Sequence, residues 1–236
     1  MAKVDRKKLL KKPDEFLTLS DKAIQWARAN MRTLIIVVSA LVLAVVCALG
    51  IQAYLRYRTA QGANALAQVF PMYQRAVLGQ ASKQEMAGAM QGLAQVVEKY
   101  GATPSGMQAR LALAGLQYST GQYAEAELNF AELAEDPGTP AQLLPLALRG
   151  LGQSLAAQKK YPQAAQAIRR AIEAAGPQTA ILLKLDLGLV LEAAGDKKAA
   201  IATYRELLKA SPDGAAAKEA TNRLVAMGID PHREPR

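Results

Sequence analysis

The sequence predicts an all-α protein, with a single transmembrane helix followed by a stack of paired helices. Three observations lead to this prediction. Residues 33–55 contain no charged side chain. Ala and Leu dominate the chain, which favours helices over strands. Beyond residue 84, glycines and prolines divide the chain into pieces of helical length, within which apolar residues recur at helical spacing.

Residues 33–55 are long enough to cross a membrane as a helix. The 23 residues would span about 34 Å at about 1.5 Å per residue, against a hydrocarbon core of about 30 Å. Thr33, Ser39 and Gln52 do not make the polar face that a soluble core helix of this length needs. A cleaved leader has a shorter apolar region, of about 7–15 residues, behind a short basic start. We therefore expect a retained anchor, and the alternative is a leader cut near residues 48–50.

Basic residues set the expected orientation of this helix. Residues 1–32 hold nine Lys and Arg against four Asp and Glu, whereas residues 33–236 hold twenty against sixteen. Because basic residues gather on the cytoplasmic side, we expect residues 1–32 to be a basic cytoplasmic segment and residues 56–236 to lie across the membrane. The basic cluster would also attract anionic lipid, and the alternative is that it only sets the topology. The mixed charges of the larger segment argue against nucleic-acid binding, which needs a basic stripe.

A row of small residues marks one face of the expected membrane helix. Ala40, Ala44 and Ala48 are spaced four residues apart, and small residues at this spacing let a partner helix approach closely. They predict a transmembrane packing face. The alternative is that alanine is simply common throughout this chain.

The rest of the chain divides into three parts. Residues 56–80 are expected to continue the membrane helix outward as a helical stalk, which Pro71 should kink or end. Residues 81–228 form the predicted helical domain, with a first helix at 84–100 and a capping helix at 214–227. Residues 229–236 form a flexible tail.

The helical domain contains an internal repeat. The segments GQYAEAELNF, KKYPQAAQAI and GDKKAAIATY align so that a small residue is followed four positions later by a larger one, and a small residue upstream also recurs in the preceding helix. In this pattern the small residues let two helices pack closely, and the larger residue fills the space between units. The predicted packing residues are Ala126, Phe130, Gly152, Ala164, Ile168, Gly188, Ala200 and Tyr204.

These repeats resemble the tetratricopeptide repeat family, whose helix–turn–helix units of about 34 residues stack into an α-solenoid. The units around residues 148–171 and 187–212 carry the pattern, and the aligned Ala126, Ala164 and Ala200 are spaced 38 and 36 residues apart. The unit at 107–138 is degenerate, because Arg110 and Gln117 occupy positions where apolar residues are usual. The alternative is an Ala-rich antiparallel bundle without a regular superhelix.

Signals for chemistry are nearly absent from the sequence. The single histidine, His232, lies in a proline-flanked tail, and the single cysteine, Cys47, lies in the apolar run, where it cannot form an intrachain disulfide. No Cys and His cluster has metal-ligand spacing, and no phosphate-binding or nucleophile motif occurs. We expect no catalytic residue, no metal, no cofactor and no enzymatic activity.

The resemblance instead implies a binding groove. In the tetratricopeptide pattern the first helices of the units line a concave face, onto which six residues fall: Leu111, Tyr118, Arg149, Gln153, Leu185 and Leu189. This mostly apolar set lacks the Lys and Asn of the carboxylate clamp found in chaperone-binding members. It suits an apolar or amphipathic protein segment rather than a charged chain end. Some of these residues, Leu185 above all, could equally be core.

The whole layout resembles the ancillary Sec translocon subunits of Gram-negative bacteria. That resemblance implies an inner-membrane adaptor with a periplasmic domain, whose partners are translocon subunits, chaperones or exported clients. Two other functions fit the layout: a cytochrome c maturation protein that holds apocytochrome, and a structural or assembly subunit of a membrane complex. The sequence leaves the client and the oligomeric state open.

Overall fold

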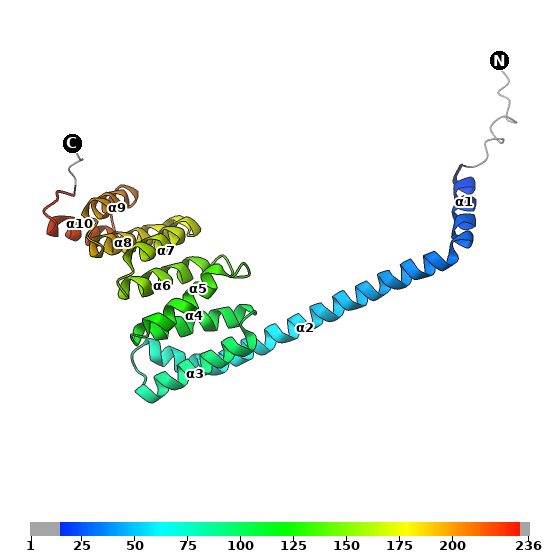
Figure 1. The fold of residues 1–236 in the computed structure, drawn as a ribbon, viewed down its shortest axis with the longest axis horizontal. Helices are drawn as coiled ribbons and strands as arrows, with labels where there is room; N and C mark the ends of the chain where they lie inside the picture. Colours follow the sequence, from blue (N-terminus) through cyan, green and yellow to red (C-terminus); the bar gives the residue numbers. More distant parts are fainter. Residues whose placement is uncertain (1–14, 232–236) are drawn as a thin grey trace, which may run out of the picture. The chain divides into compact units, whose positions relative to one another are not determined.

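The computed structural model describes residues 15–231, with side chains from residue 21 onward. Within these residues the chain forms helices and no strand, which confirms the predicted all-α fold (Figure 1). The helices are α1 (Glu15–Ala29), α2 (Met31–Val77), α3 (Lys83–Tyr100), α4 (Pro104–Ser119), α5 (Tyr123–Glu135), α6 (Leu144–Ala157), α7 (Tyr161–Ala174), α8 (Pro177–Ala193), α9 (Lys197–Ala210) and α10 (Ala215–Ala226).

The chain separates into two compact units, and the boundary falls inside α2, between Tyr57 and Arg58. The first unit contains α1 and the apolar part of α2. Among the described residues, α2 is the one helix long and apolar enough to cross a membrane. Side chains along its apolar run, including Ala40, Ala44 and Ala48, are exposed.

In the second unit, the end of α2 packs against α3. Val69 and Ala76 of α2 form one apolar cluster with Leu93 and Val96 of α3. A Cβ added at Gly92 of α3 would lie 2.9 Å from Cγ2 of Val69, so the two helices touch closely. Part of the segment predicted as a stalk therefore forms a helix pair with α3. Pro71 does not end α2, which continues to Val77.

Local sequence signals set where the next helices start. Ser82 precedes α3, and its hydroxyl accepts a hydrogen bond from the Glu85 backbone N–H while the Glu85 carboxylate accepts one from the Ser82 backbone N–H. This reciprocal pair satisfies two backbone donors at the helix start. Thr103 precedes α4, and Pro104 stands at its first position, where no backbone N–H is needed.

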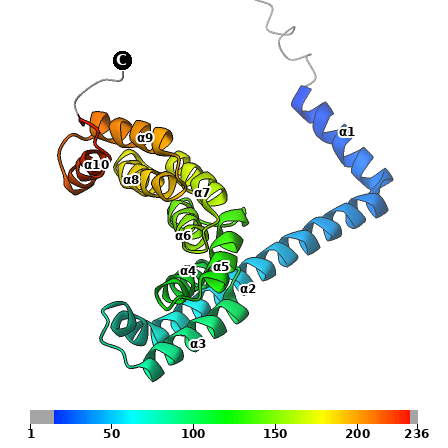
Figure 2. The same ribbon diagram turned by 60° about the vertical axis from the view of Figure 1, so that its left-hand side comes forward.

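The remaining helices form an antiparallel array. Each helix from α3 to α10 packs against the next one, and α4 also contacts α6, as α8 contacts α10. Figure 2 shows this unit following an arc, with α4, α6 and α8 toward its inner side. The pairs α4–α5, α6–α7 and α8–α9 correspond to the three aligned repeats. α10 follows the last pair, and its Leu224 is fully buried against the main core.

Glycines meet large side chains where the helices cross. A Cβ added at Gly188 of α8 would lie 2.2 Å from Cε1 of Tyr204 in α9, and one at Gly152 of α6 would lie 2.5 Å from Cγ1 of Ile168 in α7. Both large side chains are fully buried. Ala126, Ala164 and Ala200 are fully buried as well. The α6–α7 and α8–α9 pairs are therefore each spaced by a glycine opposite a large side chain.

Phe130 joins one helix pair to the next. A Cβ added at Gly150 of α6 would lie 2.4 Å from the Phe130 ring of α5. The degenerate first repeat carries polar pairs of its own, because Arg110 of α4 binds Glu132 of α5, and Asn129 donates a hydrogen bond to Gln117 at 2.9 Å. Its unusual residues are thus paired across the two helices of the unit.

Each turn between the two helices of a pair contains a residue with left-handed backbone conformation. Gly121 and Gly195 have φ of 81° and 82°, and Lys159 occupies the equivalent turn with φ of 63°. A left-handed conformation costs a non-glycine residue about 1–2 kcal/mol. The spacing of these three residues matches the 38- and 36-residue offsets of the repeat.

The described chain continues beyond residue 228, where the sequence predicts a flexible tail. Ile229 packs against the main core, and Arg205 donates a hydrogen bond to the backbone carbonyl of Asp230 at 3.5 Å. His232 lies outside the described residues, as does the start of the basic N-terminal segment.

Candidate binding groove

The six residues predicted to line a groove are all partly exposed on α4, α6 and α8. Leu111, Tyr118 and Leu185 also pack against the main hydrophobic core. Each of these three side chains therefore packs partly against the core and is partly exposed to solvent. Arg149, Gln153 and Leu189 stand outside the apolar core cluster.

Two leucines extend this surface along the same helix faces. Leu146 precedes Arg149 by three residues, and Leu182 precedes Leu185 by three, so each pair shares a face of its helix. Leu146 is 46% exposed and Leu182 is 52% exposed. Leu146 also borders a pocket of about 470 Å³ with Pro145 and Thr179. The starts of α6 and α8 thus present apolar surface that the other described residues leave exposed.

The end of α2 adds aromatic residues that the sequence analysis missed. Leu66, Phe70 and Tyr73 line a pocket of about 170 Å³ with residues of α4, including Leu111. The Phe70 and Tyr73 ring centroids are 6.0 Å apart. The sequence predicts a stalk for residues 56–80, and that prediction gives no reason to expect groove residues there.

One ion pair joins the inner helices at the middle of this surface. Nε of Arg149 in α6 donates to Oδ2 of Asp186 in α8 at 2.5 Å, and Nη2 donates to Oδ1 at 3.4 Å. Asp186 is largely buried, whereas Arg149 is about half exposed. The sequence analysis predicted Arg149 but missed its partner. Since the two charges neutralise each other, Arg149 is not available as an isolated cation for a charged ligand.

Tyr118 presents a neutral phenol beside this pair. Burial raises the pKa of Tyr118, and the neighbouring Tyr123 and Asp186 raise it further. The rings of Tyr118 and Tyr123 lie 5.4 Å apart, tilted by 59°. We define the groove surface by Phe70, Leu111, Tyr118, Leu146, Arg149, Gln153, Leu182, Leu185, Asp186 and Leu189. It is mostly apolar, and its two charged residues, Arg149 and Asp186, form an ion pair with each other.

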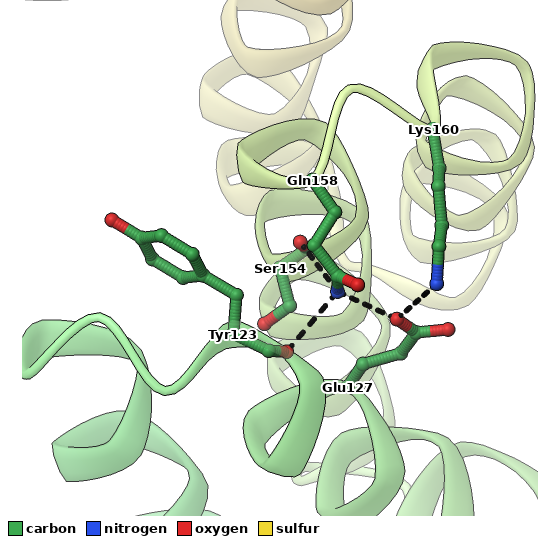
Figure 3. Close-up of polar contacts among 5 residues, drawn as sticks. All are labelled: Tyr123, Glu127, Ser154, Gln158 and Lys160. Atoms are coloured by element: carbon green, nitrogen blue, oxygen red, sulfur yellow. Dashed lines mark hydrogen bonds and ion pairs between the residues drawn. The ribbon is translucent and has the colours of Figure 1, made fainter.

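A polar cluster behind the groove ties α5 to α6 and α7 (Figure 3). Nε2 of Gln158 donates to Oε2 of Glu127 at 2.6 Å, to the Tyr123 carbonyl at 3.2 Å and to the Ser154 carbonyl at 3.1 Å. Nζ of Lys160 also reaches Oε2 of Glu127, at 2.8 Å. This cluster joins the first helix pair to the second and so helps fix the spacing of the groove helices.

The charge of Glu127 is stabilised in this cluster. Burial of the Glu127 carboxyl raises its pKa, but the hydrogen bonds from Lys160 and Gln158 outweigh this effect and hold the pKa of Glu127 below its usual value. Elsewhere in the described part of the chain, no group of three or more His, Cys, Asp or Glu side chains is placed to hold a metal ion.

Comparison with known families agrees with this architecture. A family described as tetratricopeptide repeat-like domain matches residues 25–231. The chain belongs to this family. The match begins ahead of the apolar run, so it takes in the membrane-length helix together with the repeats. Domains of this kind generally bind other proteins. A search of curated proteins found no match to the chain.

Replacing Glu127 by Gln should weaken the fold in a pH-dependent manner. The folded-state pKa of Glu127 is lowered, so its stabilisation is present above the unfolded-state pKa of about 4.3 and is lost as pH falls through the folded-state value. We expect Glu127→Gln to lower the free energy of unfolding by about 0.5–1 kcal/mol at pH 7. Urea unfolding followed by circular dichroism should show the difference from wild type shrinking below about pH 4.

Glu125 provides the matched control, because it is an exposed glutamate on the same helix. Glu125→Gln should show no comparable pH-dependent difference. Equal behaviour of the two variants would contradict the role given to the Glu127 cluster.

Proposed function

We propose that this protein is a non-enzymatic adaptor anchored in a bacterial inner membrane, with its repeat domain in the periplasm. The groove surface holds apolar or amphipathic segments of other proteins. In this role the protein assists protein export, or the handover of exported clients to chaperones, beside the translocon. The resemblance to ancillary Sec translocon subunits supplies the export role, and the groove supplies the binding role.

The exposed leucines of the inner helices carry the binding part of the proposal. Leu146 and Leu182 remain about half exposed, although Leu148 of α6 and Leu183 of α8 are almost fully buried. Covering the exposed half of a leucine side chain contributes about 1 kcal/mol. Several such residues along one surface favour an apolar segment. The paired Arg149 and Asp186 leave no unpaired charge between them to reject that segment.

The anchor and the charge distribution support the proposed location. The apolar run of α2 is exposed along its length, as a helix surrounded by lipid would be. Nine basic residues precede the run, and Arg56 and Arg58 follow it closely. The basic excess on the N-terminal side favours a cytoplasmic N-terminus.

One alternative function has an observation of its own in its favour. Ala40, Ala44 and Ala48 are exposed on α2, where they could receive a helix of another membrane subunit. The protein would then be a structural or assembly subunit of a membrane complex. The cytochrome c maturation alternative has no comparable support among the described residues.

Leu182→Glu should weaken binding of an amphipathic segment and leave the fold intact. The probe is a fluorescently labelled 18-residue peptide with one leucine-rich helical face, added to the full-length protein in lipid nanodiscs. Burying an unpaired carboxylate against this face costs several kcal/mol, so fluorescence anisotropy should show a loss of affinity of at least about tenfold, or about 1.4 kcal/mol. A lysine-rich peptide of equal length should not bind the wild type.

Leu128→Glu is the matched control, because Leu128 is 70% exposed on α5, outside the groove surface. Both variants should melt within a few degrees of wild type, since isolated surface changes have small effects on stability. If folded Leu182→Glu binds the peptide as well as Leu128→Glu does, the groove proposal is wrong. Absence of binding by the wild type, together with isolation in a stoichiometric membrane complex, would favour the assembly-subunit alternative.

The proposed orientation predicts the location of the C-terminus. A reporter enzyme that is active only in the periplasm, fused after Arg236, should be active in a Gram-negative host. The same fusion lacking residues 33–55 should be inactive, because nothing would carry the domain across the membrane. An inactive full-length fusion, or a mature protein beginning near Ile51, would overturn the anchor and its orientation.

A further inference from the structure

The helix α1 is separate from the membrane-length helix that follows it. It ends at Ala29, α2 begins at Met31, and Asn30 forms a turn between them. The Asn30 backbone N–H and side-chain amide both donate to the Trp26 carbonyl, each at 3.0 Å. The helix axis changes direction at this turn in both views (Figures 1 and 2). α1 is therefore a distinct element and not a straight extension of α2.

Residues 21–28 of α1 divide into an apolar and a polar half. At about 100° per residue, a helix places Ala23, Ile24, Trp26 and Ala27 on one half of its circumference. The other half carries Asp21, Lys22, Gln25 and Arg28. Ile24 is 50% exposed and Trp26 is 62% exposed. Two large apolar side chains of α1 are thus open to whatever surrounds the helix.

The position of α1 in the chain indicates what covers its apolar half. The turn at Asn30 comes three residues before the uncharged run starts at Thr33, a path of about 5 Å along a helix. If α2 crosses a membrane, the apolar half of α1 lies at the level where headgroups meet acyl chains. Interfacial helices combine an apolar face carrying residues such as Trp with basic residues on the opposite side.

The charge of the segment fits the same surface. Residues 1–32 hold nine basic and four acidic side chains, and a cytoplasmic leaflet rich in anionic lipid attracts such segments. Lys22 and Arg28 flank the apolar half of α1, so their long side chains can reach the headgroups while the helix lies flat.

We propose that α1 is an interfacial helix, which lies on the phospholipid bilayer at the cytoplasmic end of α2 with Ala23, Ile24, Trp26 and Ala27 toward the acyl chains. The proposal rests on the membrane anchoring proposed above. It adds a second membrane contact, made by a segment outside the apolar run. A helix held flat on the surface fixes the depth at which α2 starts and resists movement of α2 toward the periplasm.

Single-cysteine spin labelling tests the orientation of α1 in the full-length protein. In a Cys47→Ser background, Ala23→Cys and Ala27→Cys probe the apolar half, and Asp21→Cys and Gln25→Cys are the matched controls on the polar half. The protein is reconstituted in vesicles of phosphatidylcholine and phosphatidylglycerol. Labels at 23 and 27 should be relaxed preferentially by oxygen, which partitions into lipid, and labels at 21 and 25 by a water-soluble nickel complex.

The single tryptophan of the chain provides a readout without labelling, since Trp26 is the only one. Lipids carrying a nitroxide near the headgroup should quench its fluorescence more strongly than lipids carrying one near the chain end. Ala27→Glu should reduce this quenching at least about twofold by placing a charge on the apolar half, whereas Gln25→Glu should not.

The outcomes separate this proposal from the anchor on which it rests. In the unmodified protein, Cys47 should resist a membrane-impermeant maleimide until the vesicles are dissolved. If Cys47 is protected while all four labels on α1 contact water equally, the interfacial helix is wrong and the anchor stands. If Cys47 reacts in intact vesicles, the anchor itself fails. Two other outcomes would indicate that a protein surface covers this half and would overturn the lipid assignment. In one, the labels at 23 and 27 are shielded from both relaxing agents. In the other, their spectra are broadened by labels on a second copy of the protein.

Discussion

The repeat array depends on the close approach of paired helices, which glycines permit in the α6–α7 and α8–α9 pairs and which large side chains fill. Gly152 faces Ile168, and Gly188 faces Tyr204, at distances that leave no room for a methyl group. Tyr204 is fully buried, and its hydroxyl donates a hydrogen bond to Glu192 at 3.0 Å, so the ring cannot move aside without breaking that contact. Burial and the neighbouring Glu192 raise the pKa of Tyr204, which keeps this donor protonated. Because interiors are packed near their maximum density, this spacing fixes the angle between helices and hence the face that the inner helices present.

The groove surface consists of residues that this packing leaves exposed. α4, α6 and α8 use one face against their partners, and the opposite face shows residues such as Leu146 and Leu182, which nothing in the described chain covers. The cluster around Glu127 and Gln158 joins neighbouring pairs, and the Arg149–Asp186 pair links α6 to α8 across the surface itself. The scaffold and the proposed binding surface are thus built from the same helices, on opposite faces.

The fold was predictable from the sequence because its determinants are local. The uncharged run, the glycine and proline breaks and the recurring small-then-large pattern each sit within a few residues of the chain. The groove was harder to predict, because its members come from different helices. Asp186 carries no local signal that pairs it with Arg149, 37 residues earlier. Phe70 and Tyr73 were missed because the helix was expected to act as a stalk, yet the apolar spacing of Leu66, Val69 and Tyr73 already indicated a packed face. Lys159 has a left-handed backbone conformation, and its alignment with Gly121 and Gly195 is the sequence signal for that conformation.

A double-mutant cycle between Gly188 and Tyr204 tests most directly whether this close approach organises the array. Gly188→Ala should cost about 1–3 kcal/mol of unfolding free energy in the wild type, through overpacking against the ring. In a Tyr204→Leu background, Gly188→Ala should cost at least about 1 kcal/mol less. The effect of Gly188→Ala on the free energy of unfolding should then approach the stabilisation of about 0.5–1 kcal/mol that alanine gives over glycine in a helix. Gly115→Ala, at a helical glycine with nothing within 4 Å of the added methyl, sets that reference value. An equal cost of Gly188→Ala in both backgrounds would contradict the account, because the ring of Tyr204 would then not be what requires a glycine at position 188.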